Sequence, residues 1–435
     1  MNRYLQYFRQ AWNIIRQERL FSGIYIVGTG LSITMVMALS IVFYIKIANI
    51  YPETNRDRLL IVKSATGKEA KTNSQFSSSL AYSVVETCFL PLESAEAVSA
   101  VLDTWDKEGR VQPEGSRDQW PVTVKHVDTN FWTVFPFRFV SGKPFTEADM
   151  QSSIQTAVIA ESLARRLFGT ADATGRTVSL NFRQYRVCGV VRDASLITER
   201  TYAQLWLPYT LMDYRNGDGP GNLMGSMIVY ILAPSAGSVE QVRQEAIANV
   251  NRLNQSLDDV EFSILGQPDR QWQTIFRFWS NSEPDFGIIL CQYGLIFLVL
   301  LLVPAVSLSG MTDSRMERRM TEMGVRRAFG ARVSGLMTQI IAENLLFTLL
   351  GGVIGLLASW LIVVLGRSWI MEIGQSFVNL PVEGTEVTLS PSMLLNLPVF
   401  AIALAICFVL NLLSSLIPAW RNARREIIHS LNAKQ

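Results

Sequence analysis

Few residues in this chain have the types and spacing needed for catalysis or metal binding. The two histidines, His126 and His429, are too few for a zinc site or a histidine-based triad. The nearest match to a phosphate-binding loop, residues 169–177 (GTADATGRT), has five residues between its glycines and an arginine where the lysine should be. No nucleophile-elbow or zinc-protease motif occurs. We therefore expect no catalytic residue, no metal and no cofactor bound by this chain.

The most informative polar segment is residues 311–332, MTDSRMERRMTEMGVRRAFGAR. Three methionines at i, i+4 and i+7 would form one apolar stripe of a helix, and charged residues would line the other side. Because methionine is polarisable and adaptable, this stripe suits a docking surface. The alternative is a solvated basic loop. The methionines are Met316, Met320 and Met323, and the charged residues are Arg315, Arg318, Arg319, Glu322 and Arg326.

Four apolar blocks must position this segment. Hydrophobic residues make up 49% of the 435 residues and charged residues only 17%, with mean hydropathy +0.21. About 20 apolar residues are enough to cross a bilayer. The first block is longer than the apolar core of a cleaved signal peptide, so it predicts a retained anchor. The predicted spans are residues 21–45, 286–310, 335–365 and 393–416.

The distribution of basic residues predicts the orientation of these spans. Residues 1–20, 311–334 and 417–435 are rich in arginine, whereas the segments 46–285 and 366–392 are neutral or acidic. The positive-inside rule therefore places both termini and the 311–334 loop in the cytoplasm, and the other two segments outside. Net charge is only +2, which gives no reason to expect a nucleic-acid partner.

The N-terminal segment, residues 1–20, predicts an amphipathic helix. Tyr4, Phe8, Trp12 and Ile15 recur at helical spacing, with arginines off this stripe. Such a helix would lie in the lipid interface before the first span. The alternative is a short disordered leader.

Segment 46–285 predicts an α+β domain large enough for its own core, with room for two subdomains. We expect strands at 156–160 and 227–232, and helices at 161–168 and 238–253, the first closed by Gly169. Runs 176–182 and 185–191 would form a hairpin that turns at residues 183–184, and residues 64–79 and 213–226 would be loops. The sequence leaves open whether Cys88 and Cys188 form a disulfide.

Aromatic residues recur near the end of this domain. Trp272, Phe276 and Trp279 are spaced as one helical stripe. The stripe fits a stalk helix leading into the second span, an interfacial belt, or a helix that packs on its own domain.

The third span carries a carboxylate and a glycine-rich face. Glu343 is the one acidic residue within that apolar block. A charge inside a membrane points to function by default, but a polar contact between helices fits equally well. Gly351, Gly352 and Gly355 would let another helix approach closely, within the chain or across a dimer.

Residues 317–331 (ERRMTEMGVRRAFGA) resemble the cytoplasmic-loop signature of MacB/FtsX-like ABC transporter permeases. Residues 418–423 (PAWRNA) resemble the end of the family's last span. Residues 128–135, 142–149 and 157–169 resemble its periplasmic core domain. The order of one span, a large outer domain and three further spans also agrees with this family.

This resemblance implies a multi-pass permease in the cell inner membrane, with residues 46–285 in the periplasm. It would pair with a second copy or a paralogue, and a separate ABC-type ATPase, binding ATP and Mg, would drive it. A periplasmic adaptor is a further expected partner. The output would be efflux, lipoprotein extraction or control of a wall hydrolase. The rival hypothesis is a membrane-anchored scaffold with a passive loop. The implied coupling residues are Arg315, Met316, Glu317, Arg318, Met320, Glu322, Met323, Gly324, Arg326, Arg327 and Gly330.

Overall fold

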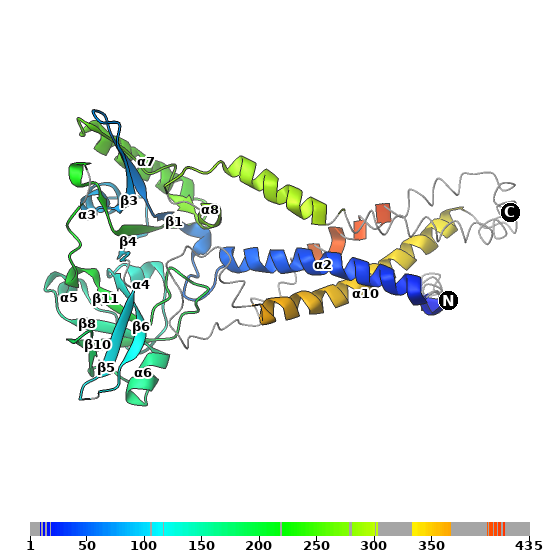
Figure 1. The fold of residues 1–435 in the computed structure, drawn as a ribbon, viewed down its shortest axis with the longest axis horizontal. Coiled ribbons are helices and arrows are strands. Elements are labelled where there is room, and N and C mark those ends of the chain that lie inside the picture. Colours follow the sequence, from blue (N-terminus) through cyan, green and yellow to red (C-terminus); the bar gives the residue numbers. More distant parts are fainter. Residues whose placement is uncertain are drawn as a thin grey trace. The chain divides into compact units, whose positions relative to one another are not determined.

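The computed structural model describes residues 9, 12–13, 15–17, 19–104, 107–115, 117–217, 220–277, 281–300, 302, 333–366, 398, 400–402, 404–406, 408–409 and 412–413. The chain forms two compact units (Figure 1). The apolar helices make up the first unit, Met1–Tyr44, Gly287–Ile370 and Leu389–Gln435. The second, called here the outer unit, comprises Ile45–Phe286 and Met371–Thr388.

Among the described residues, two helices are long and apolar enough to cross a membrane. They are α2 (Arg19–Ile47) and α10 (Val333–Leu365). A shorter apolar helix covers Phe286–Leu300, the start of the predicted second span. The predicted fourth span is described only at scattered helical positions, and the loop 311–332 lies outside the described residues. The described positions between 9 and 17 are helical.

One half of the outer unit, the barrel lobe, is a closed ring of six strands. Each strand is hydrogen-bonded to two neighbours, in the order β6, β11, β8, β10, β9, β5 and back to β6. Closure removes unpaired sheet edges. The strands are β5 (Glu108–Pro113), β6 (Trp120–Val127), β8 (Thr156–Ala160), β9 (Thr177–Leu180), β10 (Arg183–Val191) and β11 (Leu205–Pro208). Around them lie α4 (Phe131–Val134), β7 (Phe139–Gly142), α5 (Glu147–Gln151) and α6 (Glu161–Phe168).

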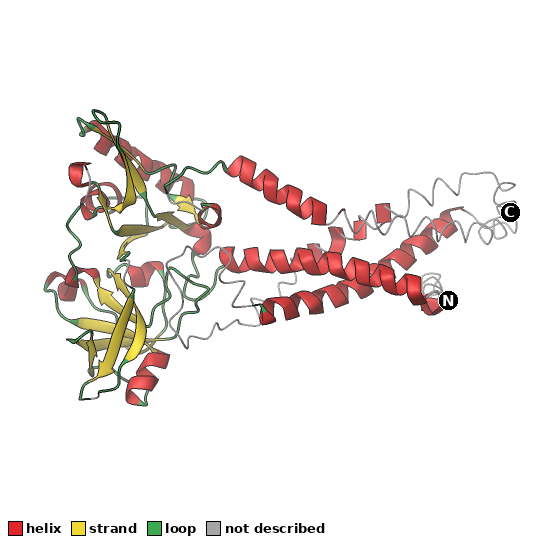
Figure 2. Ribbon diagram, in the orientation of Figure 1, coloured by secondary structure: helices red, strands yellow, loops and turns green. Residues whose placement is uncertain are grey.

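The other half, the open lobe, is built around β13 (Met227–Leu232), whose six residues are all buried. It pairs with β1 (Leu59–Val62) and β4 (Ala97–Leu102), and β4 also pairs with β6, which joins the lobes. Figure 2 shows the strands of the outer unit in yellow and its helices in red. The remaining strands are β2 (Ala65–Glu69), β3 (Gln75–Leu80), β12 (Met224–Gly225), β14 (Val260–Ser263) and β15 (Asp269–Arg270). The helices are η1 (Arg56–Arg58), α3 (Tyr82–Val84), η2 (Val85–Phe89), α7 (Val239–Gln255) and α8 (Gln271–Phe276), and two short turns, η3 (Tyr209–Leu211) and η4 (Pro220–Asn222), precede β13.

Three local predictions for the outer unit are wrong. Residues 213–226, expected to be a loop, contain η4 and the short strand β12, which pairs with β3. Residues 64–79 contain β2 and most of β3, because their polar side chains occupy a half-exposed part of the sheet. The hairpin turns at Asn181 and Phe182, where φ is +47° and +68°, and not at residues 183–184. Asparagine tolerates this left-handed conformation, so the turn needs no glycine. Gly169, with φ of +72°, closes α6 as predicted.

The region after β15 does not form a long stalk helix. α8 ends at Phe276, which is buried, and the Trp272 ring packs edge-on against Phe286 with centroids 5.4 Å apart. These contacts favour the interpretation that the aromatic stripe packs on its own domain; Trp279 lies outside the described residues. Cys88 and Cys188 are both free thiols, so they do not bridge.

Candidate functional site

The predicted coupling residues, Arg315 to Gly330, all lie outside the described residues. Their role stays a prediction. Two other places within the described residues have contacts that bear on function. One is the contact between α2 and α10, and the other is a buried polar cluster in the outer unit.

Glycines bring the backbones of α2 and α10 into contact. A Cβ atom added at Gly355 would lie 2.8 Å from the Gly30 carbonyl oxygen and 2.8 Å from Ile33 Cγ2. One added at Gly351 would lie 3.1 Å from the Gly30 nitrogen. Thr34 Oγ1 donates to the Gly30 carbonyl at 2.7 Å and also lies 3.4 Å from the Gly355 carbonyl. Of the two predicted possibilities, the structure places these glycines against a helix of the same chain.

The third predicted glycine, Gly352, faces a different neighbour. A Cβ atom there would overlap the Leu404 side chain, which belongs to the predicted fourth span. The glycine face of α10 therefore contacts two helical segments of the first unit.

Polar side chains accompany these glycines. Tyr25 Oη donates to Asn344 Oδ1 at 3.0 Å, and the Tyr25 ring packs on Phe347 with centroids 5.0 Å apart. Glu343, beside Asn344 on α10, is only 5% exposed. A hydrogen bond between helices in lipid is worth roughly 0.6 kcal/mol on average. This geometry supports a structural role for the polar positions of α10.

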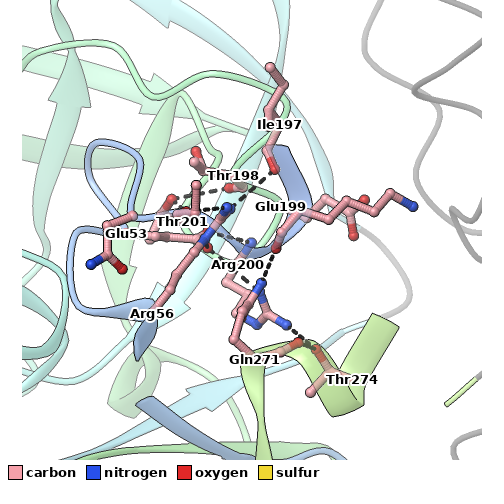
Figure 3. Close-up of polar contacts among 12 residues, drawn as sticks. Glu53, Arg56, Ile197, Thr198, Glu199, Arg200, Thr201, Gln271 and Thr274 are labelled. Carbon is pink, nitrogen blue, oxygen red and sulfur yellow. Dashed lines mark hydrogen bonds and ion pairs between the residues drawn. The ribbon is translucent and has the colours of Figure 1, made fainter. Parts of the chain in front are cut away.

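The second site is a buried polar cluster in the outer unit, named here the exit cluster (Figure 3). It lies where the chain leaves α2, and its partners come from segments distant in sequence. Its members are Glu53, Arg56, Lys125, Arg200, Thr201, Gln271 and Thr274.

Glu53 is the carboxylate of this cluster, and its side chain is fully buried. Its Oε2 lies 2.8 Å from Arg56 Nε and 3.6 Å from Arg200 Nη1. Its Oε1 accepts from the Arg200 backbone nitrogen and from Thr201 Oγ1, both at 3.2 Å. Burying a carboxylate is costly unless it is paired and hydrogen-bonded, and both oxygens of Glu53 meet this condition.

Arg56 connects Glu53 to the end of α2. Its Nη1 donates to the carbonyl oxygens of Ile45 and Ala48, at 2.8 and 2.9 Å. Gln271 Nε2 donates to the carbonyl of Lys46 at 2.6 Å. The last carbonyls of a helix lack partners within it and carry partial negative charge, so a cation there is favourable. Side chains from η1 and α8 thus cap α2.

Arg200 ties the two lobes to this cap. Its segment connects β10 to β11 in the barrel lobe, and its Nη2 donates to Thr274 Oγ1 of α8 at 2.7 Å. Lys125 Nζ of β6 donates to the carbonyls of Glu199 and Arg200, at 3.0 and 2.7 Å. The cluster therefore joins the end of α2, η1, α8 and the barrel lobe.

A second buried ion pair holds the chain just after α8. Arg277 Nε lies 2.5 Å from Asp269 Oδ2, and Nη2 lies 3.0 Å from Oδ1. Arg277 Nη2 also donates to the Leu265 carbonyl at 3.0 Å. Bidentate pairs of this kind fix geometry as well as charge. Buried ion pairs thus hold the chain both where it enters the outer unit and where it leaves α8.

Burial and charge act in opposite directions on the cluster's carboxylate. Burial by itself would raise the pKa of Glu53, but the Arg56 and Arg200 guanidiniums outweigh it, and the pKa lies below its ordinary value of 4.5. Burial lowers the pKa of Lys125 to about 8. Glu53 is thus ionised at neutral pH.

Reasoning from the sequence missed the exit cluster. The pair Glu53 and Arg56, three residues apart after an apolar block, was the available signal. Their partners Arg200 and Gln271 come from far along the chain, which no local pattern reveals. Within the part of the chain that the structure describes, no group of three His, Cys, Asp or Glu residues could hold a metal ion.

Two family models match this chain. The model for the MacB-like periplasmic core domain matches residues 22–249, more than half of the chain. The model for the FtsX-like permease C-terminal region matches residues 294–427.

Individual relatives are distant. The ABC transporter permease YvrN of Bacillus subtilis is 23% identical over 307 residues, which cover 69% of this chain and 72% of YvrN. The macrolide export ATP-binding/permease protein MacB of Chromobacterium violaceum is 25% identical over 333 residues, 74% of this chain but 46% of that protein. The solved periplasmic region of MacB from Actinobacillus actinomycetemcomitans is 18% identical, with a TM-score of 0.33 over 49% of this chain and 92% of that one.

Proposed function

Because this chain belongs to the MacB/FtsX-like ABC transporter permease family, with a MacB-like periplasmic core domain, we propose that it transmits an ATP-driven conformational change from a separate ATPase to its outer unit. The protein is a membrane protein with a periplasmic or extracellular type of domain. We place it in the cell inner membrane, with both termini cytoplasmic and residues 46–285 in the periplasm.

The continuity of α2 carries this proposal. α2 is one helix of 29 residues, which at 1.5 Å per residue is roughly 43 Å long. About 20 residues cross the apolar part of a bilayer. Its last residues, from Ile45 onward, belong to the outer unit. We propose that a movement of the membrane-spanning part of this helix reaches the outer unit through these last residues.

The ATPase is proposed as a partner, with ATP and Mg bound there and not by this chain. Residues 317–331 resemble a coupling loop, and the 435 residues contain no phosphate-binding loop of the P-loop type. The Chromobacterium relative is named an ATP-binding/permease protein, and the match covers 46% of it. We also propose a dimer with a second copy or a paralogue, and a periplasmic adaptor as a further partner.

Export from the periplasm or outer leaflet is the favoured output. The names of similar proteins include macrolide export and pyoverdine export. These names support efflux over lipoprotein extraction or hydrolase control.

Purification of the tagged full-length chain from membranes tests the proposal. We expect an ABC-type ATPase to co-purify. Met320→Asp should weaken this contact by about 2 kcal/mol or more, or roughly 30-fold in affinity, because an aspartate would be buried in an apolar interface. Met212→Asp is the control, since Met212 is an exposed methionine of the outer unit.

Two results would contradict the proposal. If no ATPase accompanies the wild-type chain, the membrane-anchored scaffold becomes the better hypothesis. If a cysteine placed at Thr321 reacts with an impermeant maleimide from outside intact cells, the loop is on the wrong side of the membrane.

A further inference from the structure

We propose that the exit cluster is the joint through which α2 moves the outer unit, with Glu53 and Arg56 as its positioning residues. This inference rests on the proposed function and assigns a residue-level device to it. In this joint the last turn of α2, the helix α8 and both lobes move as one body, so that displacement of α2 is not dissipated at its end.

Several elements of the outer unit meet at one carboxylate, that of Glu53. Arg56 binds Glu53 on one side and the Ile45 and Ala48 carbonyls on the other. Arg200 binds Glu53 through its backbone nitrogen and Thr274 of α8 through its guanidinium. Removing Arg56 would therefore leave only Gln271 of these side chains on the helix end, while the hydrophobic core that the two lobes share stays intact.

The contact at the end of α2 is made by buried charges. A helix can end with a glycine and water at low cost, whereas burying ion pairs carries a desolvation penalty of several kcal/mol per ion. Apolar contacts are non-directional, so they let surfaces slide. Charge-assisted hydrogen bonds are directional and short, and they keep one geometry under load. The buried charges at the end of α2 are thus suited to rigidity.

The two arginines of η1, Arg56 and Arg58, differ in what they bind. Arg58 lies in η1 with Arg56, but it pairs with Glu96, whose side chain is 42% exposed, and donates to the Ala233 carbonyl at 2.8 Å. Arg58 touches neither α2 nor α8 through any hydrogen bond recorded among the described residues. It therefore provides a matched control of the same residue type two positions away.

Hydrogen exchange on the intact chain in lipid nanodiscs tests the joint without nucleotide. In Arg56→Met we expect exchange at residues 45–48, 197–201 and 271–276 to rise together, by about tenfold or more, because these segments share the cluster. Arg58→Met should leave these segments unchanged. If exchange rises only near residues 53–56, or equally in both variants, the joint is refuted.

A second experiment measures hydrogen exchange on the complex with its co-purified ATPase, without nucleotide and after trapping the ATPase with ATP and vanadate. In the wild-type and Arg58→Met complexes we expect trapping to change exchange in the outer unit. Arg56→Met should still bind the ATPase and hydrolyse ATP, but should lose most of that response. A full response in Arg56→Met would overturn the inference. A wild-type chain without an ATPase would instead refute the proposed function, and the nucleotide-free arm would still decide whether the cluster is a joint.

A milder variant covers the case in which Arg56→Met does not fold. Gln271→Leu removes the hydrogen bond to the Lys46 carbonyl and leaves all three charges of the ion-pair network in place. We expect faster exchange at residues 45–48 and 271–276, and a reduced response to nucleotide trapping. Unchanged exchange at both segments would count against the joint.

Discussion

The helix α2 is held in two places by opposite chemistry. In its apolar part, Gly30 lets the backbone of α10 come within contact distance, and the partners are Gly351 and Gly355. At its end, the charged Arg56 and the amide of Gln271 bind its last carbonyls. The first contact consists mainly of packed backbone, whereas the second consists of directional hydrogen bonds.

The difference follows from the surroundings of each contact. In lipid, apolar side chains gain nothing by leaving the tails for another helix, so association depends on close packing of small residues. At the end of α2, the backbone carbonyls need donors and the helix dipole favours a cation. The glycine contact depends on the close approach of two backbones, while the exit cluster depends on charged and amide donors. Each contact thus uses the chemistry that its surroundings favour.

The largest expected effect comes from neutralising the carboxylate of the exit cluster. Glu53→Gln leaves Arg56 and Arg200 buried without their counter-charge, so we expect a loss of about 3–5 kcal/mol of stability at pH 7. Thermal unfolding of the full chain in detergent, followed by tryptophan fluorescence, measures this loss. Glu96→Gln is the control. Its pair with Arg58 is partly exposed, and its loss should cost at most about 1 kcal/mol.

The same variant predicts a pH dependence. The pKa of Glu53 in the folded chain lies below the ordinary 4.5, so its contribution is present above that value and is lost as the pH falls through the folded-state pKa. The gap in unfolding temperature between wild type and Glu53→Gln should stay constant from neutral pH to about pH 5 and narrow only below about pH 4.5. A gap that closes between pH 7 and 6 would show that Glu53 is not held as an ion.

The second effect concerns the glycine contact. Gly355→Leu would place a side chain against the Gly30 carbonyl and Ile33, which already lie within 3 Å of a Cβ atom at that position. Overpacking of this kind costs about 1–3 kcal/mol, and here the obstacle is backbone that cannot rotate away. The control is Gly23→Leu, because Gly23 has nothing within 4 Å of an added Cβ atom. Equal stability of the two variants would contradict the close approach of α2 and α10.

The glycine contact and the exit cluster also differ in how far the sequence predicts them. A long apolar stretch predicts each of α2 and α10, and the spacing of Gly351 and Gly355 predicts a close approach to another helix. Both signals are local in the sequence. Which helix fills the glycine face is not local, and only the fold identifies α2. The short apolar runs that became β8 and β13 were predictable for the same reason as the spans.

The exit cluster was not predictable from sequence, since its energy depends on distant partners. Glu53 and Arg56 look like ordinary charges after an apolar block until Arg200 and Gln271 are placed beside them. Polar segments can give the opposite error, because a predicted loop can form strands. Residues 64–79 look like a loop, yet β2 and β3 pair along their length because sheet hydrogen bonds need no apolar side chain on the exposed face.

The smallest effect sharpens the contrast between packing and hydrogen bonding within the apolar contact. Tyr25→Phe removes the donor to Asn344 but keeps the ring on Phe347, so the expected loss is roughly 0.6 kcal/mol and at most about 1.7 kcal/mol. Combining it with Asn344→Leu in a double-mutant cycle isolates the hydrogen bond, because Asn344→Leu alone also changes packing. A coupling energy of about 3–5 kcal/mol, the loss expected for Glu53→Gln, would mean that hydrogen bonding, and not the glycine face, holds α2 to α10.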